Sequence, residues 1–89
     1  MRKVTLTAQF EKDVKRAKNR NYEMNQLNKA IGLLSQGDLE DRKYRDHPLK
    51  GKYEGLRECH LSPDWLLIYH SSTKQVLLVR TGAHTDLFR

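Results

Sequence analysis

The sequence predicts a small α+β domain in which a helical hairpin packs on one face of an antiparallel sheet. Two stretches in the first half repeat their apolar residues at helical spacing, and the second half holds three apolar runs separated by polar turns. A chain of 89 residues supports one small core. We therefore expect a single domain over residues 1–89, with the element order β-α-α-β-β-β.

The first strand and helix are predicted from a change in spacing. Val4 and Leu6 alternate with polar residues, which indicates a short half-buried strand over residues 3–8. Thr7 can then cap a helix that runs to about residue 19 or 20.

The second helix should begin near Glu23 and end at Gly37, where a left-handed cap is expected. Its apolar positions recur at intervals of three and four: Met24, Leu27, Ile31 and Leu34. Neither helix can bury its apolar face alone, so the two should form a hairpin that covers the sheet.

The second half predicts three consecutive strands. Residues 53–61 mix polar and apolar positions, as a partly exposed strand does, and residues 65–69 are continuously apolar, as a central strand is. Turn-forming residues at 62–64 and 71–74 separate these strands from a third at 76–79. Short turns imply an antiparallel meander.

The charge indicates a polyanionic partner. The chain has 17 Lys and Arg against 11 Asp and Glu, a net charge of +6. The excess gathers in residues 1–20, which carry +5, and in residues 42–57, which carry +4. Nucleic acid is the simplest partner, with an acidic peptide or protein as the alternative, and a solvated helix face accounts equally well for the first cluster.

Other classes of protein are disfavoured. No run reaches the roughly 18 to 20 apolar residues that span a bilayer, and no apolar secretory stretch stands at the N-terminus, so we expect a cytosolic protein. Cys59 is the single cysteine, so it can form neither an internal disulfide nor a zinc ribbon, and we expect no chemistry from it.

Histidine is the residue that points to chemistry. His47 stands in the basic loop, His60 ends the first strand of the meander, and His84 follows the last strand, so neighbouring strands can bring all three together. His70 lies beside an ordinary polar turn and is given no role. The residue types would also allow a three-histidine metal site, but no pair has the close spacing typical of ligands, and we expect no cofactor.

A basic surface with several histidines suits metal-free cleavage of RNA. One imidazole can take the proton of the 2′-hydroxyl, another can protonate the leaving 5′-oxygen, and a cation can stabilise the phosphorane. Arg80, at the end of the last strand, is the best-placed cation, although a surface strand residue is an equal possibility. Lys50, Lys52 and Arg57 fit general phosphate contacts.

Three further residues have both a structural and a functional interpretation. Trp65 opens the most apolar strand and fits the core or its edge. Phe88 can stack on a nucleobase or close the end of the sheet. Asp64 fits a turn, or a carboxylate that orients a histidine.

The order of these motifs resembles the YafQ branch of the RelE toxin superfamily. The resemblance rests on four blocks, residues 46–51 (DHPLKG), 57–60 (RECH), 63–69 (PDWLLIY) and 80–88 (RTGAHTDLF), and the first half agrees in layout at residues 12–15 and 24–27. It implies a RelE-like, microbial-RNase-like fold and a bacterial type II toxin. Such a toxin is an endoribonuclease that cuts translated mRNA in the ribosomal A site.

The resemblance also implies site residues and partners. By position, His47, His60, Asp64 and His84 match the family's catalytic residues. Trp65 and Phe88 match its supporting aromatics, and Arg80 matches its phosphate-contacting arginine. We infer His60 as base, His84 as acid, and His47 with Asp64 as orienting groups, with base and acid open to exchange.

The implied partners are the 70S ribosome with its mRNA and a DinJ-like antitoxin. The antitoxin would lay a segment, expected to be acidic, over the basic surface and would provide the only contact with operator DNA. Two alternatives stay open: a non-catalytic RNA- or ribosome-binding module with the same basic surface, and a metal-dependent nuclease.

Overall fold

The structure is a computed structural model that describes residues 1–88. Its strands are β1 (Lys3–Leu6), β2 (His47–Pro48), β3 (Arg57–Ser62), β4 (Trp65–Ser71) and β5 (Gln75–Gly82). Its helices are α1 (Ala8–Asn19), α2 (Met24–Gln36) and α3 (His84–Leu87), with short 3-10 helices η1 (Arg42–Tyr44) and η2 (Gly51–Tyr53). Within the described residues, no helix has both the length and the apolar character needed to cross a membrane.

One five-stranded sheet runs in the order β1-β5-β4-β3-β2. The predicted antiparallel meander of β3, β4 and β5 is confirmed, and β4, the most apolar strand, lies at its centre. The sheet as a whole is mixed, because β1 pairs with β5 in parallel. The chain can make that parallel pair because the whole helical hairpin lies between the two strands in sequence.

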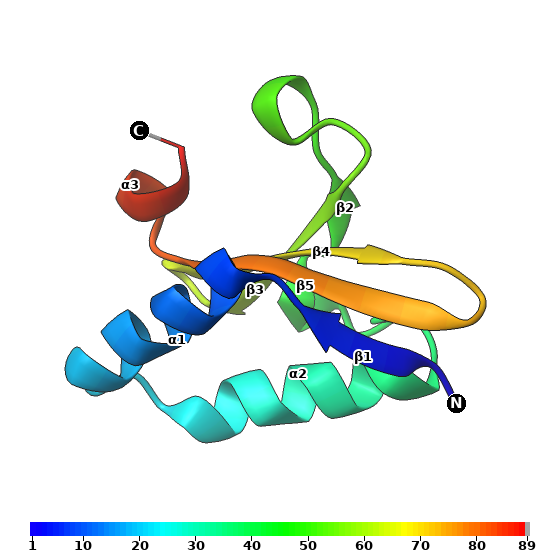
Figure 1. The fold of residues 1–89 in the computed structure, drawn as a ribbon, viewed down its shortest axis with the longest axis horizontal. Helices are drawn as coiled ribbons and strands as arrows, with labels where there is room; N and C mark the ends of the chain where they lie inside the picture. The colour runs from blue at the N-terminus through cyan, green and yellow to red at the C-terminus, as the bar shows by residue number, and fades with distance from the viewer. Residues whose placement is uncertain (89) are drawn as a thin grey trace.

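The helical hairpin covers one face of the sheet, as predicted (Figure 1). Thr7 caps α1 by accepting a hydrogen bond from the backbone N–H of Phe10 at 2.9 Å. Phe10 and Leu34, one from each helix, are buried against alternate residues of the meander strands, among them Leu67 and Leu78. This layer is the main core, and it leaves the opposite face of the sheet to other segments.

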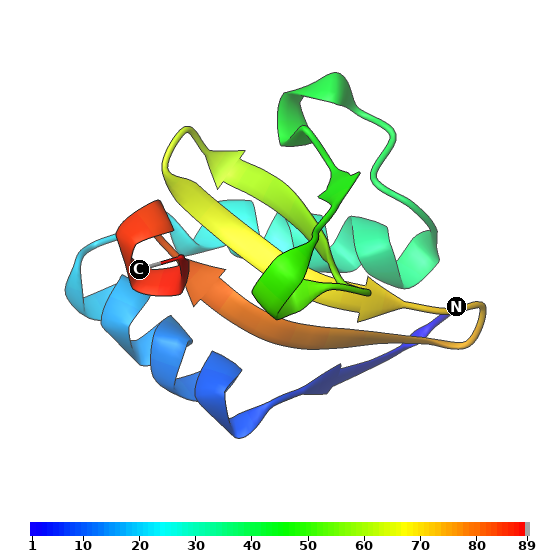
Figure 2. The ribbon, with the colours of Figure 1, turned by 90° about the horizontal axis from the view of Figure 1, so that it is seen from above.

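A second, smaller layer covers the opposite face. The segment that contains β2 and η2 and the short helix α3 lie on this side of the sheet (Figures 1 and 2). Tyr53 of η2 and Leu87 of α3 are buried there with Leu66 and Ile68 of β4. The two faces of β4 are therefore both apolar and both covered, which is why its sequence shows no alternation.

Three local predictions need correction. Gly37 has φ 168°, which is extended backbone, so α2 ends without the left-handed cap. The strand predicted from residue 53 begins at Arg57, because η2 and the left-handed Gly55 (φ 90°) turn the chain first. Val4 packs on the core, but Leu6 at the end of the edge strand β1 is 47% exposed.

Candidate active site

Three histidines form a row on the second face of the sheet. His60 in β3 shares this face with Glu58, because alternate residues of a strand point the same way, and Glu58 is paired with His47 of β2. The ring centroids of His47 and His60 lie 6.2 Å apart, and those of His60 and His84 lie 6.1 Å apart. The predicted meeting of these three side chains, here called the histidine row, is confirmed.

The carboxylate of Asp64 holds His84. Asp64 Oδ1 lies 2.6 Å from Nδ1 of His84 and accepts a hydrogen bond from the backbone N–H of the same residue at 3.1 Å. These bonds lower the pKa of Asp64 below its ordinary value. Asp64 stands in the β3–β4 turn and His84 at the start of α3, so the contact joins two segments that meet at the same end of the sheet although they are 20 residues apart in sequence.

A second carboxylate holds His47 at the other end of the row. Nε2 of His47 lies 2.8 Å from Oε2 of Glu58, which is buried although His47 is half exposed. His60 lies between these two rings, and its buried Nδ1 has no hydrogen-bond partner among residues 1–88. The buried Oε1 of Glu58 also has no partner among these residues. The middle ring therefore differs from its two neighbours, each of which is held by a carboxylate.

Two aromatic rings extend the row. The ring of Phe88 lies 6.3 Å from that of His84 and is edge-on to Tyr53 at 5.5 Å. The Tyr53 hydroxyl donates to the backbone oxygen of Leu87 at 3.0 Å and so ties η2 to α3. Phe88 is 45% exposed, which leaves an aromatic face open beside the histidines.

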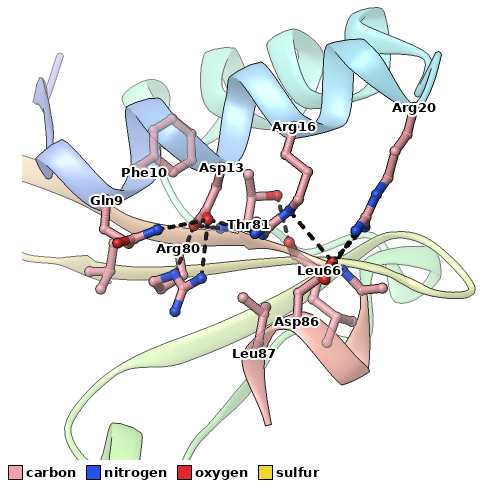
Figure 3. Close-up of polar contacts among 12 residues, drawn as sticks. Gln9, Phe10, Asp13, Arg16, Arg20, Leu66, Arg80, Thr81, Asp86 and Leu87 are labelled. Carbon is pink, nitrogen blue, oxygen red and sulfur yellow. Dashed lines mark hydrogen bonds and ion pairs between the residues drawn. The ribbon is translucent and has the colours of Figure 1, made fainter. Parts of the chain in front are cut away.

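Arg80 is fixed by a carboxylate from α1. Its Nε and Nη2 atoms donate to the two oxygens of Asp13 at 2.8 and 3.1 Å, a side-on bidentate pair (Figure 3). Asp13 is only 1% exposed. Arg80 is paired across the strands with Ile68, on the face that carries the histidine row. Nη1 makes no hydrogen bond with Asp13, and the guanidinium as a whole also interacts with Tyr53.

Asp13 is saturated with donors. Besides Arg80, it accepts hydrogen bonds from Gln9, Arg16 and the backbone N–H of Thr81. Burial acts to raise the pKa of Asp13, but the hydrogen bonds outweigh it and the pKa is lowered. Thr81 in turn accepts from the indole N–H of Trp65 at 2.9 Å. The tryptophan therefore supports β5 from the core.

A second acidic residue anchors α3 to α1. Asp86 accepts two hydrogen bonds from Arg20 at 2.7 and 3.3 Å, and it also accepts the backbone N–H of Ala83 at the start of α3 (Figure 3). The pKa of Asp86 is lowered, chiefly by Arg20. Arg16 lies within 3.8 Å of Asp86 and 3.0 Å of Asp13, so it joins the two carboxylates. We call these five residues the carboxylate network: Asp13, Arg16, Arg20, Arg80 and Asp86.

Not every predicted site residue joins the row. Trp65 is buried on the hairpin face, where its ring packs on Tyr22. Arg57 alternates with Glu58 and therefore lies on the hairpin face too, where it donates to Asp46 at 2.6 Å. Asp46 also accepts from the Tyr69 hydroxyl.

The two predicted lysines lie nearer to the row. Lys50 and Lys52 are exposed at the start and in the middle of η2, in the layer above the row. The Lys52 ammonium sits 5.3 Å from the centre of the Tyr53 ring. Within residues 1–88, no three His, Cys, Asp or Glu side chains are grouped closely enough to hold a metal ion.

Known proteins share this fold and these motifs. A family model described as "Bacterial toxin of type II toxin-antitoxin system, YafQ" matches residues 2–89. The chain belongs to the YafQ family. It is 41% identical over 88 residues to the mRNA interferase toxin YafQ of Escherichia coli K12, across 98% of this chain and 96% of that one. The predicted family and the enzyme class, that of the mRNA interferases, are confirmed.

Solved YafQ structures agree in fold. The crystal structure of YafQ from E. coli BL21(DE3) superposes with a TM-score of 0.93 at 39% identity, covering all of both chains. YafQ in the E. coli DinJ-YafQ toxin-antitoxin complex superposes with a TM-score of 0.90 at 40% identity, covering 99% of this chain and 98% of that one. The predicted α+β class is thereby confirmed for this YafQ family member.

Sequence reasoning missed several residues of the YafQ site, although two left a signal. Glu58 stands two positions before His60 in a strand, and strand alternation places residues at that spacing on the same face. Asp13 interrupts the apolar stripe of α1. Its place in that stripe is a signal, because a carboxylate is almost never fully buried unless it has a partner. Tyr53 left no signal, because η2 folds over the sheet through loop geometry.

Proposed function

We propose that this chain is a ribosome-dependent endoribonuclease toxin that cleaves translated mRNA in the ribosomal A site. The observation that supports it is the histidine row, with three imidazoles at successive centroid separations of 6.2 and 6.1 Å on an open face. General acid–base cleavage needs two proton carriers on either side of one phosphate. The site of action would be the bacterial cytoplasm, where the ribosomes are.

The reaction would use the 2′-hydroxyl as its nucleophile. His60 would take the hydroxyl proton while the 2′-oxygen bonds to the adjacent phosphorus, and His84 would protonate the departing 5′-oxygen, leaving a 2′,3′-cyclic phosphate and a free 5′-hydroxyl. Asp64 supports this assignment because it holds Nδ1 of His84 and leaves Nε2 for the proton transfer. His47, fixed by Glu58, would orient the phosphate.

Cations would stabilise the charge that builds on the phosphorane. Arg80 would use Nη1, since Asp13 occupies its other edge. Lys50 and Lys52 would contact flanking phosphates, and Phe88 would stack on a base of the bound codon. Roles for two further predicted residues would be indirect: Trp65 would support β5, and Arg57 would brace the loop before His47 through Asp46.

The partners follow from size and charge. An open sheet of this size offers little surface to bend free RNA into the geometry for attack, so the ribosome would hold the codon. The E. coli relative was crystallised with DinJ. We propose a DinJ-like antitoxin here, with an acidic segment that covers the basic surface and with the operator-binding domain of the pair.

Mapping mRNA 5′ ends after inducible expression in bacteria tests the proposal. We expect new 5′ ends in frame within translated messages, and none with His60→Ala or His84→Ala. Both variants should still bind ribosomes, which separates catalysis from a non-catalytic binding module. Toxicity that survived both changes would refute the acid–base assignment.

Two further measurements address the remaining alternatives. The first is cleavage in vitro by protein treated with a chelator, on ribosomes whose magnesium has been restored. Loss of cleavage under these conditions would favour a metal-dependent nuclease instead. The pH dependence of the cleavage rate in His60→Gln and His84→Gln would show which ring is base and which is acid. The variant that loses the acidic limb of the profile lacks the base, and the variant that loses the alkaline limb lacks the acid.

A further inference from the structure

A basic cavity borders the histidine row at the edge of the sheet. It has a volume of about 440 Å³ and lies between α2, the segment around η1, and the carboxyl half of β3. We call it the basic cavity; its charged and titratable lining residues are Lys29, Lys43, Arg45 and His60. It exists because β2 is only two residues long and pairs with the first two residues of β3, so the outer edge of the carboxyl half of β3 has no strand beside it and η1 packs there instead.

The charge of this cavity is not balanced. Lys29, Lys43 and Arg45 come from two separate segments, and no Asp or Glu lines the cavity with them. Lys29 and Lys43 also border a neighbouring hollow that contains Asp38, Glu40 and Asp41, whereas Arg45 does not. Within residues 1–88, none of the three cations makes an ion pair. Elsewhere this chain pairs arginines with carboxylates, as Asp13 and Asp86 show. Three cations that line one cavity and form no ion pair favour an anionic ligand there.

His60 connects the cavity to the row. His60 lines the cavity, and its ring is also the middle ring of the row, with its centroid 6.2 Å from that of His47 and 6.1 Å from that of His84. Arg45 stands only two residues before His47 in the chain. A strand of RNA that places one phosphate against the row can therefore continue over His60 into the cavity without crossing the molecule.

The backbone at Arg45 is held in a conformation that arginine rarely adopts. Its φ is 46° and its ψ is 42°, in the left-handed region that favours glycine or asparagine. Its neighbours hold it there: Tyr44 is buried, and Asp46 is bound by Arg57 and by the Tyr69 hydroxyl. Strain at a charged, exposed residue beside a candidate active site favours a functional role over a structural one.

We propose that the basic cavity is a subsite for a phosphodiester that flanks the cleaved bond of single-stranded RNA. Lys43 and Arg45 supply the main charges, and Lys29 of α2 closes the other side. The proposal rests on the proposed function, since it concerns the path of the same RNA. The link through His60 is what favours RNA over an acidic segment of the antitoxin.

A non-cleavable RNA tests the subsite directly. A short oligoribonucleotide with 2′-O-methyl groups has no free hydroxyl to attack, so it should bind without being cut. In an NMR titration we expect shifts at residues 43–45 as well as at the histidine row. Shifts confined to the row would overturn the subsite, and this readout does not depend on whether the wild type cleaves mRNA on the ribosome.

Paired variants test its part in the reaction. Lys43→Gln removes one charge, and Arg45→Asn removes the other with a residue that tolerates the left-handed backbone. In the double variant we expect KM for programmed ribosomes to rise about tenfold. The slope of log affinity against log salt concentration should decrease in magnitude by about 1.4, because two contacts with single-stranded RNA are lost.

The matched control is Lys12→Gln with Lys15→Gln, two exposed lysines on α1 outside the cavity. An equal rise in KM for this control would mean general attraction and would overturn a local subsite. Weaker binding of the antitoxin by the Lys43 and Arg45 variants, with unchanged cleavage, would assign the cavity to the antitoxin and overturn it as well. Wild-type protein that fails to cleave would refute the proposed function instead.

Discussion

The carboxylate network and the histidine row are both clusters of titratable groups, but they differ in how completely those groups are bonded. Asp13 accepts five hydrogen bonds and is closed to solvent. His60 has a buried nitrogen without a partner, and His84 is half exposed with one carboxylate contact. Fully satisfied polar networks make a structure rigid, whereas the rings of the row are held by at most one carboxylate each. We therefore expect the network to govern stability and geometry, and the row to govern the reaction.

The difference shows how so small a domain can hold a precise site. α1 contacts β5 through Asp13 and α3 through Arg20, so one helix sets the places of both Arg80 and the helix that carries His84 (Figure 3). None of these contacts touches the row itself. The supporting charges lie behind the site, and the site can stay open to a large substrate.

The largest expected effect is on cleavage, from His60→Ala. Because Nδ1 of His60 has no partner among residues 1–88, its removal breaks no hydrogen bond to that atom. We expect the single-turnover rate on programmed ribosomes to fall roughly 10²- to 10⁴-fold, with little change in urea unfolding. His70→Ala, an exposed strand residue away from the row, is the control and should cleave normally.

The next effect is on stability, from Asp13→Asn. Loss of the charge leaves Arg80 and Arg16 without their buried partner, and breaking such a pair costs about 3 to 5 kcal/mol. Urea unfolding at neutral pH measures this loss. Asp38→Asn, whose carboxylate pairs with Arg2 on the surface, is the matched control and should change the free energy of unfolding far less. Equal losses would contradict a special role for the network.

A smaller effect is expected from acid. The pKa of Asp86 lies below its ordinary value of 3.8, so the folded form holds its proton less tightly than the unfolded chain does. Its stabilising contribution is complete above that ordinary value and is lost as the pH falls through the lower folded value. The Tm difference between wild type and Asp86→Asn should therefore be constant near neutrality and shrink below about pH 4. A difference independent of pH would mean that the charge of Asp86 is unimportant.

The smallest effect is expected from Arg20→Gln, which weakens the link between α3 and α1 but leaves Arg16 near Asp86 and keeps the hydrogen bond from the backbone N–H of Ala83 to Asp86. We expect kcat to fall roughly two- to tenfold because His84 is less well placed, while KM for ribosomes is kept. Arg20→Lys should recover part of kcat. Lys18→Gln removes an exposed cation two residues before Arg20 and controls for charge. An equal loss of kcat in this control would contradict a role of Arg20 in positioning His84.

Much of the fold could be predicted from spacing alone, because periodicity is a local property. The stripe of α2 around Leu27 and Leu34 and the unbroken apolar run of β4 each require one kind of element. The second layer could not be predicted in this way. Tyr53 was assigned to a strand, but two left-handed glycines, Gly51 and Gly55, fold it over the sheet.

The site divides along the same line. The possible chemistry can be read from the residues alone: the number of histidines, their places near strand ends, and the excess of positive charge. The packing of distant segments places Arg80 against Asp13, puts Arg57 on the other face, and forms the basic cavity beside the row. The physical reason is that residue types set proton affinity and charge locally, whereas pairing depends on which distant segments the packing of the core brings together.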